Sequence, residues 1–301
     1  MMDAIGSRNG LQQLVPVMRK AGIKVREVLP AGLFRRQTWR FDLRNHRKIT
    51  VIDGLIGYVG SQNIIDATTD PNFPNEELVV RATGPIVAQL QAVFFMDYYF
   101  VTGNVEDNPT HLPSKITTGD SHAQVVPSSP GYRRENGKVL MISLFYAAKK
   151  RIVITTPYFV PDEIFLQAIR SATLRGVEVH LVLSKHNDQR VTNLAQCSYY
   201  ENLLEVGVKI HLYKPKFLHA KHLSIDDDVA LIGSTNIDIR SFALNSEIHI
   251  LIYDTNVVSQ LRDLQEQYFT ENELLMLDAW QQRPLLARVS QNIARLADSL
   301  L

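Results

Sequence analysis

Two copies of one polar motif carry most of the chemistry that this sequence could perform. The first copy runs from His46 to Asn63 and the second from His219 to Asn236, and both read His-x-Lys-x4-Asp-x6-Gly-Ser-x-Asn. A neutral imidazole can attack phosphorus, a protonated imidazole can release the leaving oxygen, and lysine stabilises charge on phosphoryl oxygens. The duplicated motif therefore predicts a metal-independent, phosphodiester-transferring site that works through a pair of histidines.

The spacing within each copy separates residues that face the phosphate from residues that do not. Side chains alternate along a β-strand, so the histidine and the lysine share one face, whereas the aspartate has the opposite parity. We expect the histidines and lysines to be catalytic and the aspartates to make structural contacts in a turn. The six motif residues are His46, Lys48 and Asp53 in the first copy and His219, Lys221 and Asp226 in the second.

The Gly-Ser-x-Asn end of each copy is expected on the next strand, which returns beside the histidine and the lysine. Amide and hydroxyl groups at this position could donate hydrogen bonds to a phosphate, and the glycine would let backbone or ligand approach closely. The residues expected to bind phosphate are Ser61, Asn63, Ser234 and Asn236.

A carboxylate behind each imidazole would fix its tautomer and support the imidazolium. Glu77 lies 31 residues after His46, and Glu247 lies 28 residues after His219. We expect each glutamate to orient the histidine of its own copy. Because the ordinary pKa of histidine is near 6.5, one neutral and one charged imidazole could coexist near neutral pH.

The repeat extends beyond the motif. The two motif copies are offset by 173 residues, whereas Ala21–Val25 and Val206–Ile210 are offset by 185, so the first copy carries a 12-residue insertion. Alternating strand and helix patterns predict an α/β fold of two α-β-α sandwich units with mixed sheets, packed around a shared active site. We place the first unit at 1–110, a linker at 111–132 and the second unit at 133–301. The first unit is expected to lack its opening strands.

The paired motif resembles that of the phospholipase D superfamily, and further segments resemble the bacterial cardiolipin synthases. These segments are Asp3–Ser7, Thr156–Asp162, Arg240-Ser241 with Asn245 and Glu247, and Trp280 with Arg283-Pro284. The resemblance covers essentially the whole chain. Because members of the family generally open with hydrophobic membrane helices and the start of the first unit, the resemblance implies an N-terminally truncated chain.

The resemblance implies a phosphatidyltransferase that makes cardiolipin from two phosphatidylglycerol molecules and releases glycerol. It implies a phosphohistidine intermediate on His46, with His219 acting as acid and then as base, and no cofactor. The implied partner is an anionic phospholipid at the cytoplasmic membrane, with no nucleic acid expected and with peripheral attachment of the chain. Two alternatives remain, namely a hydrolytic phospholipase D or nuclease on the same scaffold, and a truncated, inactive family member.

The composition is that of an ordinary globular protein. Of 301 residues, 45% are apolar and 21% are charged, and the formal net charge of +1 gives no strong bulk attraction to polyanions. The single cysteine, Cys197, excludes an intramolecular disulfide and a Cys-rich metal site, and we expect it to fill a small apolar space in a helix. No apolar run approaches the roughly 20 residues that span a bilayer.

Two segments could contact a lipid surface. Residues 33–48, which contain the insertion, carry six cations and one acid with interleaved aromatic residues, so they suit either docking to anionic lipid or a solvated hairpin. The cations are Arg35, Arg36, Arg40, Arg44, Arg47 and Lys48. A helix predicted over Leu285–Leu301 has an apolar stripe, which we expect to pack on the catalytic core, with membrane contact as the alternative. The stripe comprises Leu285, Leu286, Val289, Ile293, Leu296 and Leu300.

Overall fold

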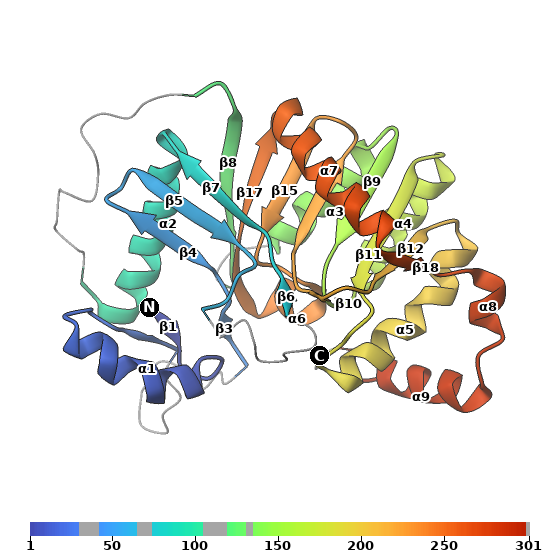
Figure 1. Ribbon diagram of the computed structural model, residues 1–301, viewed down its shortest axis with the longest axis horizontal. Coiled ribbons are helices and arrows are strands. Elements are labelled where there is room, and N and C mark those ends of the chain that lie inside the picture. The colour runs from blue at the N-terminus through green and yellow to red at the C-terminus, as the bar shows by residue number, and fades with distance from the viewer. Residues whose placement is uncertain (30–41, 65–73, 105–118, 131–134, 299–301) are drawn as a thin grey trace.

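The structure is a computed structural model in which residues 1–29, 42–64, 74–104, 119–130 and 135–298 are described. Two sheets stand side by side with their flanking helices and form one body (Figure 1). The expected α/β class is confirmed. Within the described residues, no helix combines the length and the apolar character needed to cross a membrane.

A nine-stranded mixed sheet forms the centre of the second half. Its strands follow the order β18 (Asn272–Leu274), β12 (Lys209–Tyr213), β11 (Glu178–Ser184), β9 (Arg151–Thr155), β14 (His222–Ile225), β15 (Val229–Gly233), β17 (Asn245–Tyr253) and β3 (Arg44–Asn45), with β8 (His122–Ser128) also paired to β17. The parallel strands β9, β11 and β12 are almost continuously buried. Such strands require apolar residues on both faces, which explains why their sequences read as near-continuous runs rather than alternating ones.

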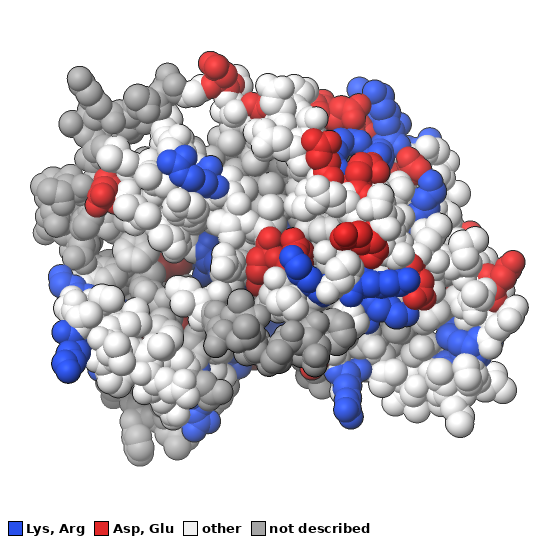
Figure 2. All heavy atoms as spheres, viewed as in Figure 1, with Lys and Arg blue, Asp and Glu red and all other residues white. Residues whose placement is uncertain are grey.

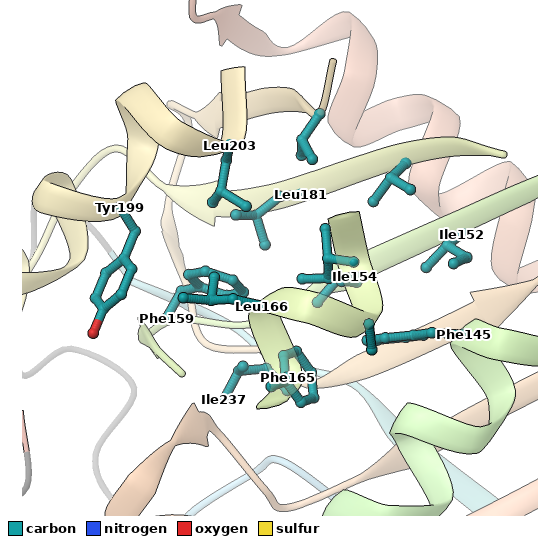
Figure 3. Close-up of a cluster of buried hydrophobic side chains, with 14 of the residues drawn as sticks. Phe145, Ile152, Ile154, Phe159, Phe165, Leu166, Leu181, Tyr199, Leu203 and Ile237 are labelled. Carbon is teal, nitrogen blue, oxygen red and sulfur yellow. The ribbon is translucent and has the colours of Figure 1, made fainter. Parts of the chain in front are cut away.

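Three helices cover one face of this sheet, namely α3 (Asn136–Ala147), α4 (Glu163–Leu174) and α5 (Arg190–Glu205). Their apolar side chains pack with those of β9 and β11 into the largest core cluster, where the rings of Phe145 and Phe165 meet edge to face at 5.1 Å (Figure 3). The start of α4 is fixed by Asp162, whose carboxylate accepts a hydrogen bond from the Phe165 N–H at 2.9 Å. Two short helices, α8 (Leu277–Gln281) and α9 (Leu285–Arg295), lie beside α5.

The first half has a smaller sheet than the second. Its strands β4 (Ile49–Ile52), β5 (Ile56–Gly60) and β7 (Val79–Thr83) are all antiparallel, whereas β1 (Met2–Asp3) and β2 (Glu27–Val28) pair in parallel on their own. In the second half, β9 joins the parallel strands to the hairpin of β14 and β15. The described residues of the first half include no counterpart of β9, so its sheet is divided. Its helices are α1 (Arg8–Lys20) and α2 (Pro85–Thr102).

The two halves share a hydrophobic core. Val59, Leu90 and Val93 of the first half pack with apolar residues of β15, β17 and α7 (Thr255–Thr270) of the second. Two short strand pairings also cross between the halves: β3 pairs with β17, and β6 (Asn75–Glu76) pairs with β13 (Phe217–Leu218). A further short pair joins β10 (Phe159–Val160) to β16 (Ile237–Asp238), which leads into α6 (Ile239–Ala243). The halves are therefore one folding unit rather than two domains on a tether.

Two sequence predictions are wrong in this region. Residues 122–128, which we assigned to the linker, form β8 and pair with β17 over seven positions, because their alternating apolar residues complete the shared core.

The apolar stripe of α9 does not pack on the catalytic core. Its described members are exposed, whereas Gln291 and Ala294 on the opposite side of the helix are buried.

The basic segment at 33–48 falls partly outside the described residues, which include neither Arg35, Arg36 nor Arg40. Arg47 is buried and is committed to protein contacts. Its Nε donates to the Glu247 carbonyl at 2.9 Å, one Nη donates to the Ser128 carbonyl at 2.9 Å, and the other forms an ion pair with Asp97. Arg47 therefore joins strands β17 and β8 of the second half to helix α2 of the first, instead of facing a lipid.

We predict that Arg47→Met lowers the free energy of unfolding by about 3–5 kcal/mol, because Asp97 and two carbonyls lose their buried partner. The measurement is urea unfolding followed by circular dichroism. Arg81→Met on the exposed face of β7 is the matched control and should change stability by less than about 1 kcal/mol. Equal, small effects for both variants would contradict the bridging role of Arg47.

Candidate active site

The pairings between the halves position both motif histidines. His46 follows β3, and its backbone N–H donates to the carbonyl of Ser246 at 2.9 Å. His219 follows β13, and its backbone N–H donates to the carbonyl of Glu76 at 2.8 Å. The backbone of each histidine is thus hydrogen-bonded to the residue that precedes a glutamate in the opposite half. The two arrangements correspond to each other in the internal repeat.

The histidine and glutamate side chains meet across the halves. Nδ1 of His46 lies 2.9 and 3.0 Å from the two carboxylate oxygens of Glu247, and Nδ1 of His219 lies 2.6 Å from Oε1 of Glu77. Our expectation that each glutamate orients the histidine of its own copy is therefore wrong. The spacing along the chain identified the four residues, but only the pairing of β3 with β17 and of β13 with β6 decides which of them are neighbours.

The motif serines hold the glutamates, which corrects the prediction that they bind phosphate. Ser61 and Ser234 are completely buried, and their hydroxyls donate at 2.5 Å to Glu77 and Glu247, respectively. Both hydroxyls also accept a backbone N–H at 3.0 Å. With these bonds made inside the protein, the hydroxyls have no path to a substrate.

The motif glycines make this arrangement possible. A Cβ atom at Gly60 would lie 2.2 Å from the carbonyl oxygen of Leu78, and one at Gly233 would lie 2.2 Å from that of Ile248. Any side chain would push the two strands apart and remove the serine from its glutamate. The close approach that we expected at glycine is therefore one of backbone, not of ligand.

Two asparagines, Asn75 and Asn245, have a role at the site that was not predicted. Nδ2 of Asn75 and of Asn245 each donates at 3.3 Å to Oε1 of the glutamate two residues further on. The signal was present in the repeat, because Asn75-Glu76-Glu77 and Asn245-Ser246-Glu247 align at an offset of 170. Each glutamate thus accepts hydrogen bonds from a histidine, a serine and an asparagine.

The motif aspartates lie away from the histidines. The carboxylate of Asp226 accepts the backbone N–H groups of Lys149, Lys150 and Arg151 at 2.8–3.2 Å, so the expected turn contact is present. Asp53 has the same left-handed conformation, with φ of 53° against 49° at Asp226. Among the described residues its carboxylate has no hydrogen-bond partner, because the first half shows no counterpart of β9 to supply the N–H groups.

Both motif lysines lie beside their histidines. Nζ of Lys48 donates to the backbone carbonyl of His46 at 2.8 Å, and Nζ of Lys221 donates to that of His219 at 2.6 Å. Asn236 is buried, and its Oδ1 has no hydrogen-bond partner within the described chain, whereas Asn63 is half-buried. The phosphate-binding role of these two asparagines stays a prediction.

The charge on the glutamates fixes the histidine tautomers. Burial alone would raise the pKa of Glu77, but hydrogen bonds from His219 and Ser61 outweigh it and lower the pKa to about 2. The pKa of Glu247 is also lowered, because its interactions with His46, Lys48 and Ser234 outweigh the effect of its burial. An ionised carboxylate can only accept hydrogen bonds. Each histidine must therefore carry its proton on Nδ1, which leaves the lone pair on Nε2 directed away from the glutamate.

Burial and neighbouring cations lower the pKa values of the four basic side chains at the site. Burial, helped by Lys221, lowers the pKa of His219 to about 4, and burial also lowers that of His46. The pKa of Lys221 falls to about 7 through burial and the nearby Lys48, and that of Lys48 falls to about 8 through burial. Both imidazoles are therefore neutral in the free site at neutral pH, which differs from the one neutral and one charged imidazole that we expected.

The two histidines differ in accessibility. The side chain of His46 is 26% exposed and that of His219 is 8% exposed. A cavity of about 10 Å³ lies behind Lys221, with His249 and Thr235 among its lining residues, and is too small for anything larger than one water molecule. His46 therefore presents the more accessible imidazole to a phosphodiester.

Comparisons with known proteins agree with this geometry. Residues 141–269 match the family model described as "Cardiolipin synthase, PLD-like domain". Cardiolipin synthase A of Serratia proteamaculans is 34% identical over 97% of this chain and 62% of its own length, and that of Proteus mirabilis is 34% identical over 100% of this chain and 64% of its own length. The chain thus spans less than two thirds of these relatives. A phosphatidylserine synthase from Haemophilus influenzae shares the fold, with a TM-score of 0.66 over 87% of this chain and 72% of its own, at 17% identity.

We predict that an oxyanion entering the site takes up a proton. Negative charge raises the pKa of a neighbouring lysine, and at pH 8 Lys221, with a free pKa of about 7, is mostly neutral. Sulfate brings no titratable proton of its own at this pH. Calorimetric titration with sulfate at pH 8, in buffers of different ionisation enthalpy, should show uptake of about half to one proton per chain.

Lys221→Met should remove the part of this uptake that Lys221 contributes and leave only the proton that His219 takes up, whereas Lys214→Met on the exposed surface should leave the uptake unchanged. Sulfate binding without proton uptake in the unmodified protein would show that the lysines are already charged, and would contradict the lowered pKa of Lys221.

Proposed function

The chain belongs to the bacterial cardiolipin synthase family of the phospholipase D superfamily, and on this basis we propose that it is a phosphatidyltransferase that joins two phosphatidylglycerol molecules into cardiolipin. The observation that carries the proposal is the pair of crossed histidine–glutamate contacts, with Nε2 of His46 and of His219 left for chemistry. The substrate is an anionic phospholipid held at a membrane surface, to which the chain binds peripherally. Lys48 and Lys221 neutralise its phosphate.

In the first step, Nε2 of His46 attacks phosphorus, and the bond from phosphorus to the oxygen of the headgroup glycerol breaks. Glu247 supports the positive charge that develops on His46, because its ionised carboxylate accepts a hydrogen bond from the Nδ1–H group. His219, which gains a proton when the anionic substrate enters, donates it from Nε2 to the departing glycerol oxygen. The products are free glycerol and a phosphatidyl group bound to His46.

In the second step, the terminal hydroxyl of another phosphatidylglycerol attacks the phosphohistidine. His219, now neutral, accepts the proton of that hydroxyl, and the bond between phosphorus and His46 breaks to release cardiolipin. One phosphodiester replaces another, so no external energy source or cofactor is required. His46 is assigned as the nucleophile because it is the more exposed of the two histidines.

The proposed activity predicts which products appear. With phosphatidylglycerol labelled in its terminal glycerol and dispersed in mixed micelles, the protein should release labelled glycerol and form cardiolipin. His46→Ala and His219→Ala should each lower the rate by at least about a thousandfold. Products are measured by thin-layer chromatography and mass spectrometry. Phosphatidic acid in place of cardiolipin would indicate that water, rather than a lipid hydroxyl, is the acceptor and would contradict the transfer reaction.

A second prediction separates the roles of the two crossed pairs. A phosphatidyl ester of p-nitrophenol has a leaving group that departs without a proton, so its first step needs the nucleophile but not the acid. We expect Glu77→Gln and His219→Ala to release nitrophenol in a burst and to accumulate phosphohistidine on His46. Glu247→Gln and His46→Ala should stay slow with the same ester, because they affect the nucleophile.

The comparison is internally controlled, since Glu77→Gln and Glu247→Gln are the same change at corresponding positions of the repeat. With phosphatidylglycerol itself, both should lower kcat by about 10²–10⁴ while KM changes little. If the activated ester instead rescued Glu247→Gln and left Glu77→Gln slow, the roles of His46 and His219 would be reversed.

A further inference from the structure

Helix α9 presents its apolar side to the outside of the protein. Its stripe of Leu285, Leu286, Val289, Ile293 and Leu296 is 54–87% exposed. Positions 285, 289, 293 and 296 follow a spacing of 4, 4 and 3 residues, so they form one continuous face along the whole helix. Exposed apolar residues in such a row mark an interaction surface, whereas single ones need no explanation.

The inner side of α9 is attached to α5 by polar contacts. Arg283 and Arg288 bind the two carboxylate oxygens of Glu201 at 2.8 and 3.5 Å, and Nε of Arg283 also donates to Gln291 at 3.0 Å. Tyr199 donates to Asp298 just beyond the end of the helix. Polar contacts therefore hold the helix in place. Its apolar stripe lies on the opposite side and makes no contribution to this attachment.

A second helix of the same edge has related properties. Figure 1 shows α1 and α9 at opposite ends of the lower edge of the molecule, with β3, β10 and α6 near the active site between them. Leu14 and Val17 of α1 are exposed, and Arg19 and Lys20 lie in its last turn. α1 corresponds to α5 in the repeat, but within the described chain no helix covers it as α9 covers α5.

Charge indicates what this edge contacts. Helix α1 contains the exposed cations Arg8, Arg19 and Lys20 and no acidic residue, so its formal charge is +3. Helix α9 has no acidic residue either, but its two arginines face the protein: Arg288 lies beside Glu201, and the guanidinium of Arg295 lies over the Tyr199 ring. In Figure 2 the lower right of the molecule, where α9 lies, is an almost uncharged surface, with charged side chains of both signs along its upper border. An edge with an apolar face at one end and exposed cations at the other suits the interface of an anionic bilayer, where the leucines of α9 enter the acyl boundary and the cations of α1 meet the phosphates.

We propose that α1 and α9 form a membrane-docking edge, in which the stripe of α9 inserts into the surface of an anionic bilayer and α1 supports it from the other side of the active site. The inference rests on the proposed function, since a phosphatidyltransferase has to reach its lipid at a membrane. It adds the element that makes the contact.

Vesicle binding tests the inference separately from catalysis. The variant with Leu285→Gln, Leu286→Gln and Leu296→Gln removes three exposed side chains, so its circular dichroism and melting temperature should match those of the unmodified protein. Its partitioning onto vesicles of phosphatidylglycerol and phosphatidylethanolamine should fall at least about tenfold in sedimentation assays. A control variant with Val139→Gln, Ile164→Gln and Leu174→Gln changes three other exposed apolar residues, on α3 and α4, and should bind normally.

A direct probe adds a positive signal. Leu286→Trp should show a blue shift of its fluorescence and quenching by lipids brominated in the acyl chains when anionic vesicles are added, and a weaker response with neutral vesicles. Ile164→Trp on α4 should show neither change. Absence of quenching at Leu286→Trp on vesicles that sediment the protein would place the membrane contact elsewhere and overturn the inference.

Activity on a short-chain phosphatidylglycerol below its micelle concentration separates the two proposals. If the triple variant of α9 turns over this monomeric lipid as the unmodified protein does, but fails on vesicles, the docking edge is supported. If the unmodified protein binds vesicles through α9 and turns over neither substrate, the proposed function fails alone. If the triple variant binds vesicles normally and instead converts a dimer into a monomer in sedimentation velocity, the stripe is a contact between two copies of the chain and the inference is wrong.

Discussion

The contact between each histidine and the glutamate of the opposite half is the constraint on which the rest of the site depends. His46 has no carboxylate partner until β3 pairs with β17, and His219 has none until β13 pairs with β6. Neither half can therefore form a complete histidine pair of its own. The buried core between the halves and the Arg47 bridge supply the rigidity that these contacts need, because hydrogen bonds of 2.6–3.0 Å tolerate little relative movement.

The same contacts explain why so many polar groups can be buried together. Burying a carboxylate is costly unless its lone pairs are satisfied, and Glu247 is completely buried. The carboxylate of Glu247 accepts hydrogen bonds from Asn245 and Ser234 in addition to that from His46. Ser234 can reach it because Gly233 lets β15 and β17 approach closely. Removing the glycine would therefore damage the site from a distance, through the position of the serine, although the glycine itself touches no reacting group.

The sequence predicted the fold class and the identity of most site residues, because both depend on patterns that repeat along the chain. Two copies of the motif and the alternation of strands and helices are local signals. The partner of each histidine is not local, since it depends on which strands of different halves become neighbours. The serines illustrate the same limit: their type fits phosphate binding, and only the packing of β5 on β7 shows that Ser61 is fully enclosed.

The apolar stripe of α9 presents the reverse case. Periodicity located the stripe along the sequence, but an amphipathic pattern gives only the relative direction of the apolar side, not what it faces. Glu201 of α5 determines which side of α9 lies against α5, because it binds two arginines of the segment around α9. Because ion pairs and a buried glutamine hold the helix, its leucines remain available at the surface. The structure thus separates two tasks in one short helix: polar contacts attach it to the catalytic core, and apolar side chains are left for a partner outside the protein.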